Sequence, residues 1–101
     1  MASLPSVGWQ TEKSVSTGET WDVGKTEEEG IFLLSVRSVT SGEVTLGRTG
    51  DQNENVKFNN VSDFVNYDCG ESGCYEIRLI NKVPIGDTSP TFLALRVTRV
   101  R

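Results

Sequence analysis

The stretch IFLLSVRS at residues 31–38 decides the fold class of this chain. Phe32, Leu34 and Val36 fall on one face of an extended segment, and polar residues such as Arg37 fall on the other. Alternation with a period of two is typical of a β-strand with one buried face. The stretch therefore predicts a strand that covers an apolar core.

Similar short patterns, separated by turns rich in Gly, Ser, Asn and Asp, continue on both sides of this strand. The expected strands are residues 7–11, 20–23, 31–38, 43–48, 56–58, 64–67, 75–80 and 91–100. The one candidate for a helical turn is 62–66. About eight strands at this spacing predict an all-β, antiparallel β-sandwich of seven or eight strands. Eight strands favour a jelly roll, and seven favour an immunoglobulin-like or fibronectin-like sandwich.

Composition supports one β-rich domain. The 101 residues include 12 Val, 4 Ile and 10 Thr, but only 2 Ala and 1 Met. Branching at Cβ disfavours helices and suits a pleated sheet. A chain of this length forms one domain, which we expect to span residues 7–101 after a disordered N-terminal segment, 1–6.

Charge and residue types exclude several classes of function. The chain has 10 Lys+Arg, 14 Asp+Glu and no histidine, for a net charge of −4. Residues 1–76 hold 13 of the acidic side chains, whereas residues 77–101 are basic. An acidic body argues against nucleic-acid binding, and the absence of histidine removes Ser-His and Cys-His nucleophiles. The longest apolar run, 31–34, is too short for membrane insertion, so we expect neither an enzyme nor a membrane protein.

The two cysteines flank a short glycine-containing turn. Cys69 and Cys74 enclose Gly-Glu-Ser-Gly, with a predicted strand on either side. A hairpin here brings the cysteines close enough for a disulfide, and a free thiol pair is the alternative. A disulfide would place the protein outside a reducing cytosol, in an extracellular, periplasmic or cell-surface location. The N-terminus has no signal-peptide pattern.

Aromatic and polar residues supply candidates for a ligand site. Trp21 lies between polar neighbours, and an outward Trp21 or Trp9 could stack on a sugar ring. Asn81 and Asp87 lie in the longest connection without a strand pattern, 81–90, and could hydrogen-bond a ligand. The alternative is that both tryptophans anchor the core.

The stretch from Asp51 to Asn55 is the candidate metal site. Asp51, Asn53 and Asn55 place oxygen ligands at alternate positions, as calcium loops do. The alternative is a polar hairpin tip, because Asn and Asp favour turns. We expect no other cofactor.

These features favour a non-enzymatic extracellular or surface binding module, with carbohydrate as the preferred ligand. One alternative is a protein-interaction domain, an inhibitor or secreted effector, that presents the 69–74 hairpin or the 81–90 loop to a target. Another is a structural subunit of a coat or surface array. Glycan or protein is thus the expected partner.

Overall fold

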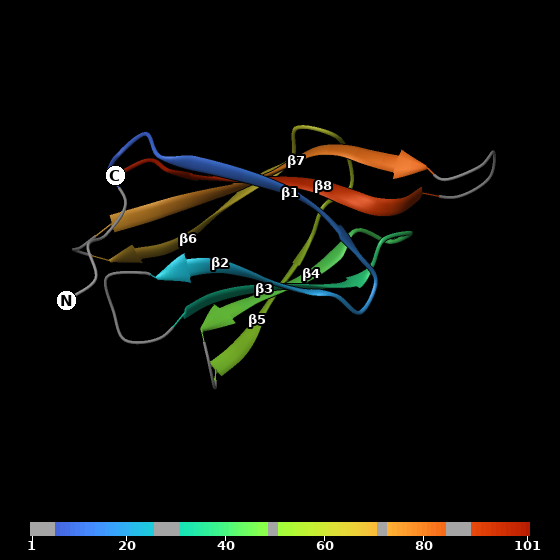
Figure 1. The fold of residues 1–101 in the computed structure, drawn as a ribbon, viewed down its shortest axis with the longest axis horizontal. Coiled ribbons are helices and arrows are strands. Elements are labelled where there is room, and N and C mark those ends of the chain that lie inside the picture. The colour runs from blue at the N-terminus through green and yellow to red at the C-terminus, as the bar shows by residue number, and fades with distance from the viewer. Residues whose placement is uncertain (1–5, 26–30, 49–50, 71–72, 85–89) are drawn as a thin grey trace.

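Two four-stranded antiparallel sheets pack face to face in this protein (Figure 1). The computed structural model describes residues 6–25, 31–48, 51–70, 73–84 and 90–101. Its strands are β1 (Gln10–Ser16), β2 (Thr20–Lys25), β3 (Ile31–Ser38), β4 (Glu43–Arg48), β5 (Asp51–Lys57), β6 (Phe64–Gly70), β7 (Gly73–Pro84) and β8 (Pro90–Arg99). The predicted all-β sandwich is confirmed, and the two sheets do not close into a barrel.

The strands follow one another in space nearly as they do in sequence. Sheet A has the order β1-β8-β7-β6, and sheet B has the order β2-β3-β4-β5. The first and last strands lie side by side, so the chain runs up and down around the sandwich. Jelly rolls and immunoglobulin domains instead use Greek-key connections. The observed strand order thus differs from both topologies that we expected.

Several predicted boundaries were wrong. The first strand begins at Gln10 rather than residue 7, because Gly8 has a φ of +95° and lies in a turn. The polar stretch from Asp51 belongs to β5 and is not a hairpin tip. β7 continues to Pro84 and β8 begins at Pro90, so the whole of the predicted loop 81–90 lies in strands or outside the described residues. Of the expected disordered segment 1–6, residues 1–5 also lie outside the described residues.

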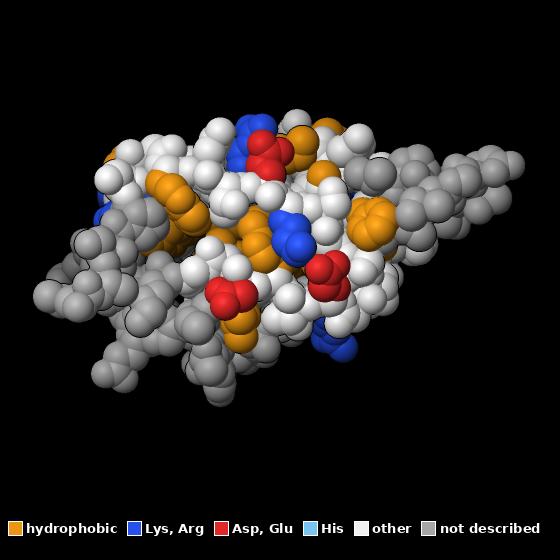
Figure 2. Space-filling model, viewed as in Figure 1, with side chains coloured by type: hydrophobic (Ala, Val, Ile, Leu, Met, Phe, Trp, Pro, Cys, Tyr) orange, Lys and Arg blue, Asp and Glu red, His pale blue; other side chains and the backbone are white. Residues whose placement is uncertain are grey.

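The core fills the space between the two sheets. Phe32 of β3 stacks on Tyr67 of β6 with ring centroids 4.7 Å apart and lies 6.1 Å from the ring of Tyr75. The remaining buried apolar residues include Val15, Trp21, Leu34, Val36, Val44, Leu46, Phe58, Ile77, Leu79, Leu93, Leu95 and Val97. Figure 2 shows apolar side chains reaching the surface between the layers at the edge where β1 and β2 lie in front. Burial of these facing side chains is the main force that holds the layers together.

The β1–β2 turn carries the chain from sheet A to sheet B. The carboxylate of Glu19 accepts the backbone N–H of Ser16 at 3.1 Å and lies 3.5 Å from the ammonium of Lys13. The carbonyl of Glu19 then accepts the N–H of Val36. The hydrogen bond from Ser16, helped by the charge of Lys13, lowers the pKa of Glu19.

A second close contact joins the β3–β4 turn to the chain after β5. The N–H of Phe58 donates to the carbonyl of Gly42 at 2.9 Å, and the side chain of Phe58 is buried. Gly42 has a φ of +77°, and a Cβ at this position would overlap the carbonyl oxygen of Phe58. Both the conformation and the space at this turn therefore require glycine.

We expect Gly42→Ala to lower the free energy of unfolding by about 3 kcal/mol, because backbone strain and steric overlap add together. Gly18→Ala is the matched control, since Gly18 also has a positive φ but open space around its Cβ position. It should cost about 1 kcal/mol. Urea denaturation of both variants measures the difference, and equal losses would show that the contact with Phe58 is unimportant.

We expect the wild type to be more stable than Glu19→Gln at neutral pH. Because the folded pKa of Glu19 is lowered, its contribution to stability is present above the ordinary glutamate pKa, about 4.3. That contribution disappears as the pH falls through the lowered folded value. Urea midpoints from pH 7 to pH 2.5 should converge for the two proteins. A difference independent of pH would contradict this role, and Glu54→Gln, on the exposed edge of sheet B, is the control.

Candidate functional site

A row of polar side chains crosses the outer face of sheet B. Thr20, Ser35, Thr45 and Asn55 are register partners on β2, β3, β4 and β5. The hydroxyl groups of Thr20 and Ser35 are hydrogen-bonded at 2.8 Å, and the Thr45 hydroxyl donates to the amide oxygen of Asn55 at 3.2 Å. We call these four residues the polar row. Because their strands are neighbours, they offer hydroxyl and amide groups at the strand spacing of about 4.8 Å.

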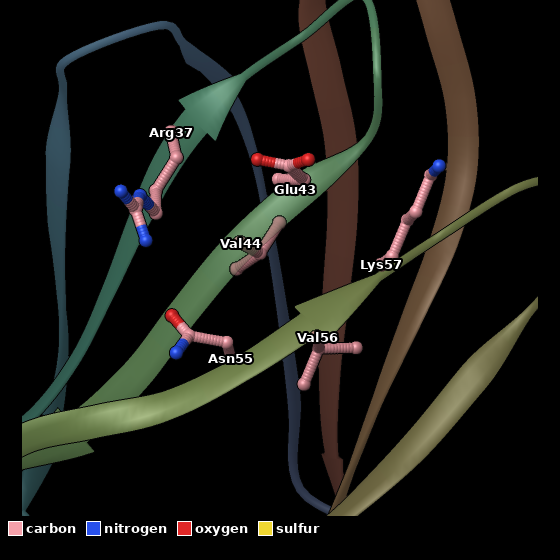
Figure 3. A pocket seen from close by; sticks show the side chains of 6 residues that line it. All are labelled: Arg37, Glu43, Val44, Asn55, Val56 and Lys57. Atoms are coloured by element: carbon pink, nitrogen blue, oxygen red, sulfur yellow. The ribbon is translucent and has the colours of Figure 1, made fainter.

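A pocket of about 230 Å³ lies beside the polar row (Figure 3). Its lining comes from three adjacent strands: Arg37 of β3, Glu43 and Val44 of β4, and Asn55, Val56 and Lys57 of β5. In Figure 3, the carboxylate of Glu43 lies between the guanidinium of Arg37 and the ammonium of Lys57. The pocket thus combines apolar, amide and charged groups.

A β-bulge places Arg37 at this pocket. Val36 pairs with Val44 and Ser38 pairs with Glu43, so that Arg37 is one extra residue on β3. A bulge twists the strand and re-aims the extra side chain, and bulges are common next to functional sites. The side chain of Val36 is buried, whereas that of Arg37 is exposed.

The charged groups of the pocket form no ion pairs. No nitrogen of Arg37 or Lys57 lies within 4.0 Å of a carboxylate oxygen in the described part of the chain. Glu43 is the register partner of Lys57, yet their charged groups remain apart. All three side chains are exposed, and their charges are available to a ligand.

The outer face of sheet A differs, because its arginines are paired. Arg96 bonds the carboxylate of Glu12 at 3.2 Å, and Arg78 bonds that of Glu76 at 2.9 Å. Arg78 also lies 4.7 Å above the ring of Phe64. The hydrogen bond from Arg78 to Glu76 raises the pKa of the arginine. Arg78 and Arg96 thus each have a carboxylate partner within the protein, although the Nε of Arg96 is buried without a hydrogen-bond partner.

The predicted ligand residues do not gather at one place. Trp21 is 8% exposed and packs in the core, so of the two alternatives considered for it, the core anchor is confirmed and the outward position is not. Thr20 and Asp22, the polar residues on either side of Trp21, are exposed, so Trp21 lies on the inner face of β2. Trp9 is half-buried against the core, and exposed Asn81 lies on β7 of the other sheet, where its Oδ1 accepts the N–H of Lys82. Asp87 lies outside the described residues.

The calcium-loop prediction is not supported by the local backbone. Residues 51–55 form part of β5, an edge strand, rather than a loop that can wrap around an ion. The oxygen of Asn55 accepts a hydrogen bond from Thr45. The side chains of Asp51 and Asn53 lie outside the described residues. In the described part of the chain, no three His, Cys, Asp or Glu residues are grouped for metal binding.

The two predicted cysteine positions lie on adjoining strands. Gly70 of β6 pairs with Gly73 of β7, so the backbones of Cys69 and Cys74 lie one residue beyond this pair. Cys74 is buried, and none of the described cysteines is free. The side chain of Cys69 lies outside the described residues, and the disulfide stays a prediction.

Sequence reasoning missed Arg37, Glu43 and Lys57 as site residues. Alternation already placed Arg37 and Glu43 on polar faces, but their meeting with Lys57 depends on the pairing of β3, β4 and β5. The bulge at Arg37 has no signal in the sequence.

Comparison with protein-family models, with curated proteins and with solved structures finds no match to this chain. Among the described residues, no helix is long and apolar enough to cross a membrane. The site is therefore interpreted from its own chemistry.

Proposed function

We propose that this protein is a non-enzymatic binding module that holds a carbohydrate on the outer face of sheet B. The observation that carries the proposal is the pocket beside the polar row. Hydroxyl, amide and carboxylate groups there can exchange hydrogen bonds with sugar hydroxyls, as Ser, Thr, Asn and Glu side chains do in general. The tryptophans are not part of this surface.

The size of the pocket favours a polymer over a small free ligand. Sites that enclose a whole small molecule have volumes of roughly 300–1,000 Å³. A pocket of about 230 Å³ takes one ring or side group and leaves the rest of the ligand outside. The polar row extends from Asn55 to Thr20 across all four strands and offers contacts to neighbouring rings.

A protein-interaction domain is the second candidate. The end of β7 and the start of β8 lie side by side at one end of the sandwich in Figure 1. The described part of this strand pair presents exposed Asn81 and half-buried Lys82 and Phe92. A preorganised strand pair lowers the ordering cost of binding to a target. The 69–74 hairpin and a structural role in a coat or array are the remaining candidates.

We also infer an extracellular, periplasmic or cell-surface location from a disulfide between Cys69 and Cys74. The neighbouring strand positions and the burial of Cys74 support this pairing. Disulfides persist in oxidising compartments.

Loss of the polar row should weaken carbohydrate binding. We expect Asn55→Ala to bind a responding glycan about tenfold more weakly, which corresponds to about 1.4 kcal/mol and suits one or two lost hydrogen bonds. Asn81→Ala, an equally exposed amide on the other sheet, is the control. Affinity electrophoresis against a panel of soluble polysaccharides, followed by calorimetry, measures the effect. Absence of binding to the whole panel, or an equal loss in Asn81→Ala, would overturn the proposal.

Thiol labelling before and after reduction tests the predicted disulfide. In the denatured, unreduced protein we expect no thiol to react with iodoacetamide, and after reduction we expect both Cys69 and Cys74 to react, as read by mass. Reduction should lower the free energy of unfolding by about 2 kcal/mol, the chain-entropy value for so short a loop. The Cys69→Ser/Cys74→Ser variant should be insensitive to reductant. Two reactive thiols before reduction would contradict the pairing.

A further inference from the structure

The geometry points to an acidic saccharide, a sugar that carries a carboxylate, as the ligand of the sheet B pocket, with the carboxylate bound by Arg37 and attracted further by the nearby charge of Lys57. This inference rests on the proposed carbohydrate binding and names the class of sugar. It comes from the contrast between the two outer faces of the sandwich.

Charge pairing separates the two faces. On sheet A, Arg78 and Arg96 each bond a carboxylate of the protein, at 2.9 and 3.2 Å. On sheet B, Arg37 and Lys57 have no such partner among the described residues, although Glu43 lies between them. Arg37 and Lys57 are thus exposed beside the pocket, and no carboxylate of the described residues forms an ion pair with either of them. A carboxylate of a ligand can take that place.

The position of Arg37 adds a second observation. It is the extra residue of a β-bulge, at the point where β3 meets the start of β4. A guanidinium can donate two parallel hydrogen bonds to one carboxylate, whereas the ammonium of Lys57 acts as a compact charge. A bulge that turns Arg37 toward the pocket suits recognition of a planar carboxylate.

The remaining groups of the pocket favour a sugar over a densely charged polymer. Glu43 repels anions but accepts hydrogen bonds from hydroxyl groups, and the amide of Asn55 can both donate and accept. The two cations and one carboxylate leave one net positive charge at the site, within a chain of net charge −4. That balance matches one carboxylate among several hydroxyls and disfavours closely spaced sulfates or phosphates.

The test compares polysaccharides that differ in charge. Polygalacturonate and alginate are the carboxylated probes, dextran and soluble starch are neutral, and dextran sulfate is the sulfated probe. We expect a carboxylated polymer to bind at least tenfold more tightly than the neutral ones, and its affinity to fall as salt rises from 50 to 500 mM. Sulfated polymer should bind more weakly than the best carboxylated one.

Variants locate the interaction. Arg37→Gln and Lys57→Gln should each reduce the affinity for the carboxylated polymer about tenfold or more, and should reduce any affinity for the neutral polymers much less. Arg96→Gln and Lys82→Gln, which remove the same charges on sheet A, should bind as the wild type does. Thermal unfolding of each variant verifies that the fold is retained. If Arg37→Gln does not fold, Arg37→Lys replaces it, and the loss of bidentate hydrogen bonding should still weaken binding.

The outcomes separate this inference from the proposed function. Neutral polymers that bind as well as carboxylated ones would overturn the acidic-sugar inference and leave carbohydrate binding standing. Tightest binding of dextran sulfate, or equal losses in the sheet A variants, would also overturn it, because general charge attraction would then suffice. No binding to any polymer would overturn the proposed function itself.

Discussion

The packing of Phe32 against Tyr67 and Tyr75 is the contact on which the two-layer structure depends. Phe32 belongs to sheet B and the two tyrosines to sheet A, so their stacked and tilted rings join the layers through side chains. Aromatic pairs of this kind add to the free energy of apolar burial. Since both sheets must present apolar residues inward, the polar alternate positions face outward. Function on this sandwich is thus confined to outer faces, edges and turns.

In the up-and-down strand order, strands that follow one another in the chain lie next to each other within sheet B, and β6, β7 and β8 do so within sheet A. On sheet B, that order aligns Thr20, Ser35, Thr45 and Asn55 in one row and brings the pocket residues of β3, β4 and β5 together. Sheet A has the same number of strands, but its ion pairs neutralise Arg78 and Arg96. Two faces with the same architecture therefore differ in the chemistry that they offer to a partner.

Local alternation was sufficient to predict much of the fold but not the site. Strands 31–38 and 43–48 were predicted at their observed bounds, because a buried apolar residue stands at every second position, Phe32, Leu34 and Val36 in the first and Val44 and Leu46 in the second. The edge strand β5 was missed at Asp51–Asn55, since an edge strand needs little apolar surface and charged or polar residues protect it from pairing with other chains. Trp21 was ambiguous, because its polar neighbours occupy the opposite face of the same strand. The pocket depends on the pairing register and on the bulge at Arg37, which involve residues distant in sequence.

The acidity of the chain limits how a charged ligand could be recognised. A net charge of −4 repels an anionic polymer at long range, so attraction has to arise at short distance from Arg37 and Lys57. The negative charge of Glu43, which lies between the two cations in the pocket, makes the region of positive potential smaller still. Under these conditions hydrogen-bond geometry, rather than total charge, decides which anion binds. A guanidinium turned by a bulge toward a half-apolar pocket supplies such geometry, and Thr45 and Asn55 extend it to neighbouring hydroxyl groups.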